Sequence, residues 1–467
     1  MNNNSSFFKA IGQFFLEIFK AIWTFLKAIG QFFLKVFKAI WTFIKKLFTN
    51  SSVLSSIISI GVGLVFGLII MIIISFFIED ASPLDAFSGL GKLILGPFSS
   101  GSKQSLLSNT GDVIFYSVPL IMTGLSVAIA YKTGLFNIGA AGQYVMGTIG
   151  CLLVALYLPT TNRFSGIMVW ILAFLAGAAL SALWGIIPGL LKAFFNINEV
   201  IICIMTNWIA ANIASWLFIN CPGIISKVNT KSAFLITPYE TGNYTPKLGL
   251  DMIFKGSYID MGIVLAILIA ILIFIILNKT TFGYELKACG SNREASRYAG
   301  LNEKKNIILS MAIAGALAGM GACFYFLNNI EYKYISQYAG LPAYGFNGIA
   351  SAFLANCHPI GVIFSSIFIR WLNNGGEFLT GVGFNRYIAD IVVAVIIYLA
   401  GFTRFISEII MKHRKKKEKE YSKVDGTVIN TNIEEKVDET TSETQKEEMN
   451  ESPPNESTII EEVSHNE

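Results

Sequence analysis

The chain has 467 residues, of which 53% are hydrophobic and only 14% are charged, and its net charge is +4. A soluble domain carries roughly 25% charged residues, so this composition excludes a protein whose whole surface faces water. Many apolar runs reach about 20 residues, the length that crosses a bilayer as a helix. We therefore predict an all-α, polytopic membrane protein.

Residues 1–50 contain a duplication. The stretch KAIGQFFLEIFKAIWTF (9–25) recurs 18 residues later as KAIGQFFLKVFKAIWTF (27–43). A period of 18 is five helical turns, so both copies place their lysines on one narrow stripe of a largely aromatic and aliphatic helix. This pattern predicts an amphipathic helix that lies in the membrane interface and is attracted by anionic lipid. A docking surface for partner subunits is the alternative.

Ten apolar segments follow within residues 51–411, and we predict them as about ten transmembrane helices. Their ranges are 53–78, 113–131, 138–158, 166–195, 200–219, 259–277, 307–327, 341–357, 360–372 and 387–410. Two of them, 341–357 and 360–372, are short and interrupted by Gly, Asn and Pro. Whether these two are full or re-entrant spans stays open.

Three basic segments set the expected orientation. They are the first repeat, the loop 279–306 with its six Lys and Arg residues, and Lys412-His-Arg-Lys-Lys-Lys417 after the last apolar segment. An even number of crossings places all three on one side, which the positive-inside rule makes the cytoplasm. We expect a multi-pass protein of the plasma membrane with both termini cytoplasmic. Residues 412–467 comprise this basic stop segment and an acidic tail that we predict to be disordered.

The polar loop 279–306 carries helix signals of its own. Ser291-Asn-Arg-Glu294 matches a capping box, in which Ser291 and Glu294 bond each other's backbone. Gly300 stands where a helix leaves through a left-handed residue. The signals predict a helix over 292–299, about two turns, which is stable only if it rests on something else.

The two faces of this predicted helix differ in chemistry. Ala295 and Ala299 share one face, and Arg293 and Arg297 share another. A ridge of small residues flanked by arginines suits a helix that inserts into a groove on a polar or acidic partner. The alternative is an ordinary cytoplasmic loop whose arginines only set the topology.

No motif for energy conversion is present in the sequence. The chain lacks a G-x-x-x-x-G-K-[ST] phosphate loop and an H-E-x-x-H motif, so we expect no enzyme, no metal site and no bound cofactor. The six cysteines are scattered and indicate packing positions. His358, which precedes a proline in a turn, is expected to cap rather than to bind a ligand. Asp390 is the one carboxylate that could serve an ion-coupled carrier working alone, which stays an alternative.

Uncharged polar residues gather where the apolar segments break. Amides at membrane depth can donate to and accept from a neutral polar solute without the cost of a buried charge. The candidates for lining a solute pathway are five amides and one neighbouring carboxylate: Asn137, Gln143, Asn198, Asn207, Asn347 and Glu199. Hydrogen bonding between helices is the alternative for each. Small-residue runs such as Gly315-Ala-Leu-Ala-Gly319 are typical of helix packing.

Three motifs carry a resemblance to a known family. They are GLFNIGAAGQYVMG (134–147), NEVIICIMTNWIA (198–210) and FGYELKACGSNREASRYAGLNEKKN (282–306). Together they resemble the permease subunits of ABC importers, in the branched-chain amino acid/ribose permease family and its nucleoside permease subgroup. The resemblance runs from about residue 53 to 410 and leaves the N-terminal repeat and the acidic tail outside.

The resemblance implies that loop 279–306 holds the coupling helix that docks on an ATPase subunit. Carried onto this chain, with the capping serine added, the coupling residues are Ser291, Arg293, Glu294, Ala295, Arg297, Ala299 and Gly300. Two positions depart from the family pattern. Ala141 stands where relatives usually have Glu, and Arg293 stands where they often have Pro.

The resemblance also implies the function and the partners. The chain would be the permease subunit of an ABC importer for nucleosides, in which a cytoplasmic ABC ATPase hydrolyses the ATP. A second homologous permease, an external substrate-binding lipoprotein and membrane lipids complete the partners, with no nucleic acid. A ribose-like sugar or branched-chain amino acid permease is the alternative within the class. A scaffold or pore-forming protein, suggested only by the lysine–aromatic repeat, is a third reading.

Overall fold

The described part of the chain is almost entirely helical. The computed structural model describes residues 51–78, 82–220, 225–226, 231–232, 244–328, 333–334 and 340–400, together with Glu408 and Lys412. The predicted interfacial helix over 1–50 and, apart from Lys412, the predicted tail lie outside the described residues and stay predictions.

Fourteen α-helices, two 3-10 helices and three two-residue strands make up the described elements. The α-helices are α2 (Ser51–Ser75), α3 (Asp85–Leu95), α4 (Lys103–Lys132), α5 (Ala140–Tyr157), α6 (Arg163–Phe195), α7 (Glu199–Asn220), α8 (Leu250–Ile253), α9 (Gly262–Lys279), α10 (Thr281–Ser291), α11 (Arg293–Tyr298), α12 (Glu303–Phe326), α14 (Ala343–Leu354), α15 (Pro359–Glu377) and α16 (Tyr387–Ala400). The 3-10 helices are η1 (Gly96–Ser99) and η2 (Phe378–Val382). The strands β1 (Ile225–Ser226), β2 (Lys231–Ser232) and β3 (Lys333–Tyr334) pair antiparallel in the order β1-β2-β3. The all-α fold class is confirmed.

Seven of the described helices are long and apolar enough to cross a membrane: α2, α4, α5, α6, α7, α9 and α12. This finding confirms a polytopic membrane protein. Three more helices, α14, α15 and α16, occupy the remaining predicted segments. The total of about ten crossings stays a prediction.

Helices α14 and α15 form an antiparallel hairpin with one short arm. The 12 residues of α14 cover about 18 Å, less than the roughly 30 Å of a hydrocarbon core. Between the arms, Asn356 and Cys357 take the left-handed conformation, with φ of 50° and 52°. Ser351 of α14 lies 2.8 Å from the hydroxyl of Ser365 and 2.6 Å from that of Ser366, both in α15. Helix α14 is therefore too short to span a membrane by itself.

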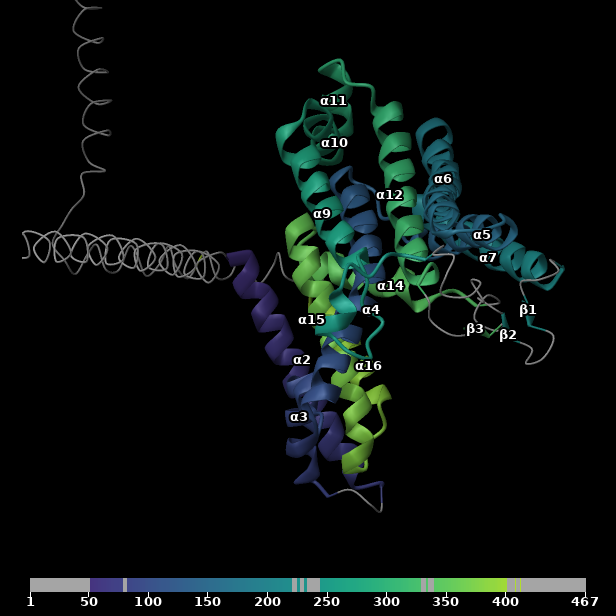
Figure 1. Cartoon of the computed structure of the whole chain (residues 1–467). Coiled ribbons are helices and arrows are strands. Elements are labelled where there is room, and N and C mark those ends of the chain that lie inside the picture. The colour runs from purple at the N-terminus through teal and green to yellow at the C-terminus, as the bar shows by residue number, and fades with distance from the viewer. Residues whose placement is uncertain are drawn as a thin grey trace, which may run out of the picture. The chain divides into compact units, whose positions relative to one another are not determined.

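The turn of this hairpin lies beside the end of α9. Nδ1 of His358 accepts from the Gly361 N–H at 3.3 Å and caps α15, which confirms the expected capping role. The imidazole lies 5.4 Å from the ring of Phe274 in α9. Burial of the ring, and then the charge of Lys132, lower the pKa of His358 and favour the neutral acceptor. Helices α10 and α11 follow α9 at this end, which we call the α11 end; the opposite end is the far end (Figure 1).

Both chain ends of the helical bundle lie at the α11 end. Near the start of α2, the Ser56 hydroxyl donates to the Leu354 carbonyl at 2.7 Å, beside the hairpin turn. The Ser59 hydroxyl donates to the Leu399 carbonyl at 3.4 Å, so α16 also ends here. Residues 51 and 400 therefore emerge on the same side as α11, as an even number of crossings requires.

Helix α12 is the centre of the bundle, where it packs against α6, α4 and α5 (Figure 1). Small residues let the backbones meet. A Cβ added to Gly315 would stand 2.4 Å from the Ser181 carbonyl, and one on Gly147 would stand 2.5 Å from the Cα of Gly319. The Ser181 hydroxyl lies 2.6 Å from the carbonyl oxygens of both Gln143 and Gly315 and can donate to either. The run from Gly315 to Gly319 thus packs helices, as its spacing predicts.

We expect Gly315→Ala to lower stability by about 1–3 kcal/mol, because its methyl group overlaps the backbone of α6 and the two helices must separate. The measurement is the thermal unfolding midpoint of the purified protein in detergent. Gly61→Ala in α2 is the control, since a Cβ there meets nothing within 4 Å. An equal or higher midpoint for Gly315→Ala than for Gly61→Ala would contradict the packing described.

Candidate functional site

Helix α11 begins with a different capping residue from the one that the sequence predicts, but it ends at the predicted glycine. Ser291 is the last residue of α10, and the cap is Asn292, whose side chain accepts from the Ala295 N–H at 3.0 Å. The predicted capping box of Ser291 and Glu294 is therefore wrong. Because α10 continues to Ser291, Asn292 is the first residue with extended backbone, and Asn caps as well as Ser. The left-handed exit at Gly300 is confirmed by its φ of +79°.

One face of α11 rests on the bundle. Ser296 is the buried residue of this helix, and its hydroxyl donates to the Arg293 carbonyl at 2.7 Å. The Arg293 guanidinium donates to the Gly134 carbonyl at 3.4 Å and lies 3.9 Å from the Glu303 carboxylate. Contacts to the α4–α5 connection and to the start of α12 thus hold a helix that is too short to be stable alone.

The opposite face of α11 is exposed. Ala295, Arg297 and Ala299 are all exposed on the faces away from Ser296, and Tyr298 is 86% exposed. Glu294 and Gly300 are exposed as well. The face therefore offers an aromatic ring, a cation and a ridge of small residues to a partner.

Helix α10 carries α11 and lies backbone to backbone on the turn after α4. A Cβ on Gly290 would stand 2.3 Å from the Lys132 carbonyl, and one on Gly134 would stand 3.0 Å from the Cα of Gly290. From α12, the fully buried Asn306 donates to the Glu285 carboxylate at 3.2 Å. Helix α10 therefore contacts both the end of α4 and the start of α12.

Three residues after Gly134, the same connection enters the interior at Asn137. The Asn137 amide donates to the Ser126 hydroxyl at 3.0 Å and to the Gln143 side-chain oxygen at 2.9 Å. The Gln143 amide donates back to the Asn137 side-chain oxygen at 3.2 Å. The two amides form a reciprocal pair with both residues buried.

Helix α7 joins this pair through Asn207. Its side-chain oxygen accepts from the Gly142 N–H at 2.8 Å, and its amide donates to the Ile138 carbonyl at 3.0 Å. We call Ser126, Asn137, Gln143, Ser181 and Asn207 the amide network. It connects α4, α5, α6 and α7 around the first turn of α5.

The other predicted pathway residues lie elsewhere. Asn198 is exposed and accepts from the Val200 N–H at 2.9 Å, so it caps α7. The Glu199 carboxylate is 2.9 Å from the Lys192 ammonium, at the α11 end. Asn347 is half-buried on α14 and makes no side-chain hydrogen bond within the described residues. Of the six candidates, the structure brings together Asn137, Gln143 and Asn207.

Arg370 in α15 belongs to none of the sequence motifs described above. Its guanidinium carbon lies 4.5 Å from the centre of the Tyr116 ring in α4, inside the bundle toward the far end. The signal that could have found it is its place as the lone cation in the apolar segment 360–372. A charged residue within such a segment indicates a functional site.

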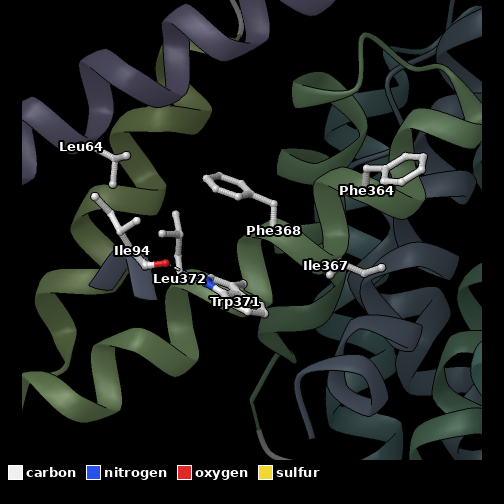
Figure 2. A pocket seen from close by; sticks show the side chains of 7 residues that line it. All are labelled: Leu64, Ile94, Phe364, Ile367, Phe368, Trp371 and Leu372. Carbon is white, nitrogen blue, oxygen red and sulfur yellow. Dashed lines mark hydrogen bonds between the residues drawn. The ribbon is translucent and has the colours of Figure 1, made fainter. Parts of the chain in front are cut away.

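A hollow of about 270 Å³ between α2, α3 and α15 carries no polar recognition group (Figure 2). Its lining residues are apolar or aromatic: Leu64, Ile94, Phe364, Ile367, Phe368, Trp371 and Leu372. The Trp371 N–H is already bonded to the Ile94 carbonyl at 2.9 Å. This chemistry does not suit a polar solute.

Comparison with known proteins shows which family model and which proteins this chain is similar to. Residues 109–401 match the family model described as branched-chain amino acid transport system / permease component. The guanosine ABC transporter permease protein NupP of Bacillus subtilis is 33% identical over 371 residues, which are 78% of this chain and 98% of the relative. The nucleoside ABC transporter permease protein NupB of Lactococcus lactis is 32% identical over 80% of this chain and 97% of its own.

A second protein of Bacillus subtilis, the guanosine ABC transporter permease protein NupQ, is 24% identical over 55% of this chain and 77% of its own. No solved structure matches the chain.

We expect Asn137→Leu and Gln143→Leu each to lower stability by about 1–3 kcal/mol, because each removes the hydrogen bonds that the buried partner amide makes within the pair. The double variant should cost less than the sum of the two, since both amides are lost together. Chemical unfolding of the four proteins in detergent measures this cycle.

The control is Asn212→Leu in α7, whose exposed amide bonds only within its own helix. It should change stability by no more than about 0.5 kcal/mol. Strict additivity in the cycle would show that the two amides are not a pair.

Proposed function

The chain belongs to the family of branched-chain amino acid transport system permease components, and from that premise we propose that it is the membrane permease subunit of an ABC importer that carries nucleosides. The observation that carries this proposal is its similarity along nearly the whole length of two permeases named for guanosine and for nucleosides. The family is named for amino acid transport. Uptake of a leucine-like substrate or of a sugar, instead of a nucleoside, is therefore among the outcomes of the test.

The energy for transport comes from a partner ATPase. The sequence holds no phosphate loop, so ATP is bound and hydrolysed on another chain. Helix α11 is the docking element, because it pairs an exposed face with a face that is held by the bundle. Ala295, Arg297 and Ala299 contact the ATPase, whereas Arg293 holds the helix on the permease.

The remaining coupling residues support this contact. Gly300 allows the sharp exit of α11, Glu294 lies exposed beside the docking face, and Ser291 ends α10 just before the cap. In this chain Arg293, where relatives often have Pro, adds the ion pair to Glu303.

The motion of α11 reaches the interior through the α4–α5 connection. Gly290 of α10 and Arg293 of α11 both touch the turn that includes Gly134, and Asn137 lies three residues further on. A displacement of α11 therefore moves Asn137 and Gln143 of the amide network relative to Asn207 of α7. In the present conformation the amides bond one another, and in another they can turn toward a solute. Two states with different contacts to the solute are what alternating access requires.

The pathway candidates then have separate roles. Asn137, Gln143 and Asn207 form a gate, and Asn347 faces the solute from the short helix α14. Asn198 and Glu199 line the exit at the α11 end.

The α11 end is the cytoplasmic end. Residues 51 and 400 emerge there, and the segments that they lead to carry the lysine-rich repeat and the cluster Lys412–Lys417. The positive-inside rule places such segments, and hence both termini, in the cytoplasm. The external binding lipoprotein docks at the far end.

A second permease of related sequence completes the membrane part. NupP and NupQ are both named as permeases of a guanosine ABC transporter of one organism, and both are similar to this chain. That observation supports a pair of unlike permeases. An ion-coupled carrier working alone finds less support, because Asp390 lies exposed on α16 instead of in an interior site.

Proteoliposomes that hold the complete complex should accumulate guanosine or uridine only when ATP is supplied. The measurement is uptake of the radiolabelled nucleoside, with ribose and leucine in parallel. Accumulation of ribose or leucine without any nucleoside would remove the substrate assignment and leave the permease function intact.

We expect Arg297→Glu to reduce ATP-dependent uptake about tenfold or more, because the reversed charge opposes docking of α11. Membrane insertion and the unfolding midpoint should not change, since the side chain is exposed. Lys305→Glu is the matched control, as Lys305 is an exposed cation at the same end. Full uptake by Arg297→Glu, or equal loss in both variants, would count against the docking role.

A further inference from the structure

Arg370 is a cation with unused hydrogen-bonding capacity inside the bundle. Its side chain is 20% exposed, and the nearest carboxylate among the described residues, Glu377, is 3.9 Å away and 54% exposed. Its Nε is buried and has no hydrogen-bond partner in the described part of the chain. An arginine has five N–H donors, and this one uses few of them.

A continuous row of tyrosine rings passes beside Arg370. The Tyr116 ring centre lies 6.4 Å from that of Tyr258 and 6.2 Å from that of Tyr325. Tyr325 lies 5.1 Å from Tyr344, which stacks on Tyr144 at 6.0 Å with an interplanar angle of 24°. We call these five residues the tyrosine row.

The two ends of the tyrosine row lie at places of functional interest. At the far end, the Tyr258 N–H donates to the Asp112 carboxylate at 2.9 Å. At the inner end, Tyr144 directly follows Gln143 of the amide network. The row therefore leads from the far end to the amide network, on side chains from the α8–α9 connection and from α4, α12, α14 and α5.

Two amides next to Arg370 add hydrogen-bond acceptors. Asn373 and Asn374 stand three and four residues after Arg370, a spacing that places them beside it along α15. The side-chain oxygen of each is buried and has no partner among the described residues. Buried polar atoms are nearly always bonded in proteins, so these oxygens are available to a ligand.

We propose that Arg370 and the tyrosine row form the site that recognises the nucleobase of the solute, with a preference for bases whose edge carries hydrogen-bond acceptors. The inference rests on the proposed function and names the residues that give it specificity. Aromatic side chains stack on any base, at about 1–3 kcal/mol per base. In the present conformation the rings contact one another, so a base enters the row by replacing a ring–ring contact with ring–base contacts.

The guanidinium sets the choice of base. It donates and cannot accept, and its fork matches the O6 and N7 acceptors of guanine. Adenine presents an amino group in place of O6, which would meet the same donors unfavourably. The site thus favours guanosine or inosine over adenosine.

The charges around Arg370 favour a neutral solute. The Glu377 carboxylate lies 3.9 Å from the guanidinium, and Asp112 lies within its electrostatic reach. Two carboxylates around one cation leave no net positive charge for a phosphate, so a nucleoside fits this site better than a nucleotide does.

The test is equilibrium binding of radiolabelled guanosine and adenosine to the purified permease–ATPase complex. The binding lipoprotein is left out because it would impose a selectivity of its own. The unmodified complex should bind guanosine more tightly than adenosine. Arg370→Met should weaken guanosine binding about tenfold and change adenosine binding by less than about twofold, as loss of a bidentate contact predicts. Arg370→Lys keeps the charge but not the planar fork of donors. Its affinity for guanosine should therefore lie between those of the unmodified complex and of Arg370→Met.

Two controls separate recognition from structure. Arg386→Met removes an exposed cation that lies 5.4 Å from the ring of the neighbouring Tyr387, and it should leave both affinities unchanged. Tyr325→Leu should weaken both nucleosides alike, because stacking tolerates any base. Should Arg370→Met fail to assemble, Arg370→Lys decides the question from the ratio of the two affinities.

The outcomes distinguish this site from the proposed function. An unchanged affinity ratio in both Arg370 variants, equal affinities in the unmodified complex or the absence of any guanosine binding would overturn the site. Nucleoside uptake by the full complex would persist in those cases. Failure of the unmodified full complex to take up any nucleoside would overturn the proposed function, and this site with it.

Discussion

The contact between Gly290 and the Lys132–Gly134 turn is the constraint on which the rest of the structure depends. Without side chains between them, α10 and the end of α4 approach as bare backbone. The contact gives a six-residue helix a rigid base, and the same connection carries Asn137 into the interior. One short stretch of chain therefore joins the exposed face of α11, which we propose docks on the ATPase, to the buried amide network, which we propose as a gate. A larger residue at either glycine would push these two parts of the molecule apart.

The polar residues of the interior are arranged in two ways that suit different tasks. The side chains of the amide network are hydrogen-bonded to one another and to nearby backbone groups, so they link four helices. Around Arg370, by contrast, a guanidinium N–H and two amide oxygens stay unbonded within the described residues. A self-satisfied cluster stabilises a conformation, whereas an unsatisfied one is ready for a ligand. We place the gate at the first and the recognition of the base at the second.

Much of the fold was predictable, because long apolar runs, positive charge and Gly300 are local signals. The capping residue was not, since Ser291 and Asn292 are equally good caps and only the length of α10 decides between them. The grouping of Asn137, Gln143 and Asn207 needs the meeting of α5 and α7, which no local pattern contains. The same holds for Arg370 and Tyr116, 254 positions apart in the sequence but 4.5 Å apart in space.

We propose that α11 is the element of this chain that contacts the partner ATPase. The most direct test is photo-crosslinking from a benzoylphenylalanine placed at Tyr298, with the same probe at the exposed Phe87 of α3 as the control. In membranes that hold the complete, ATP-hydrolysing complex, we predict an adduct between position 298 and the ATPase subunit, and none from position 87. An active complex in which position 298 forms no such adduct would contradict the account.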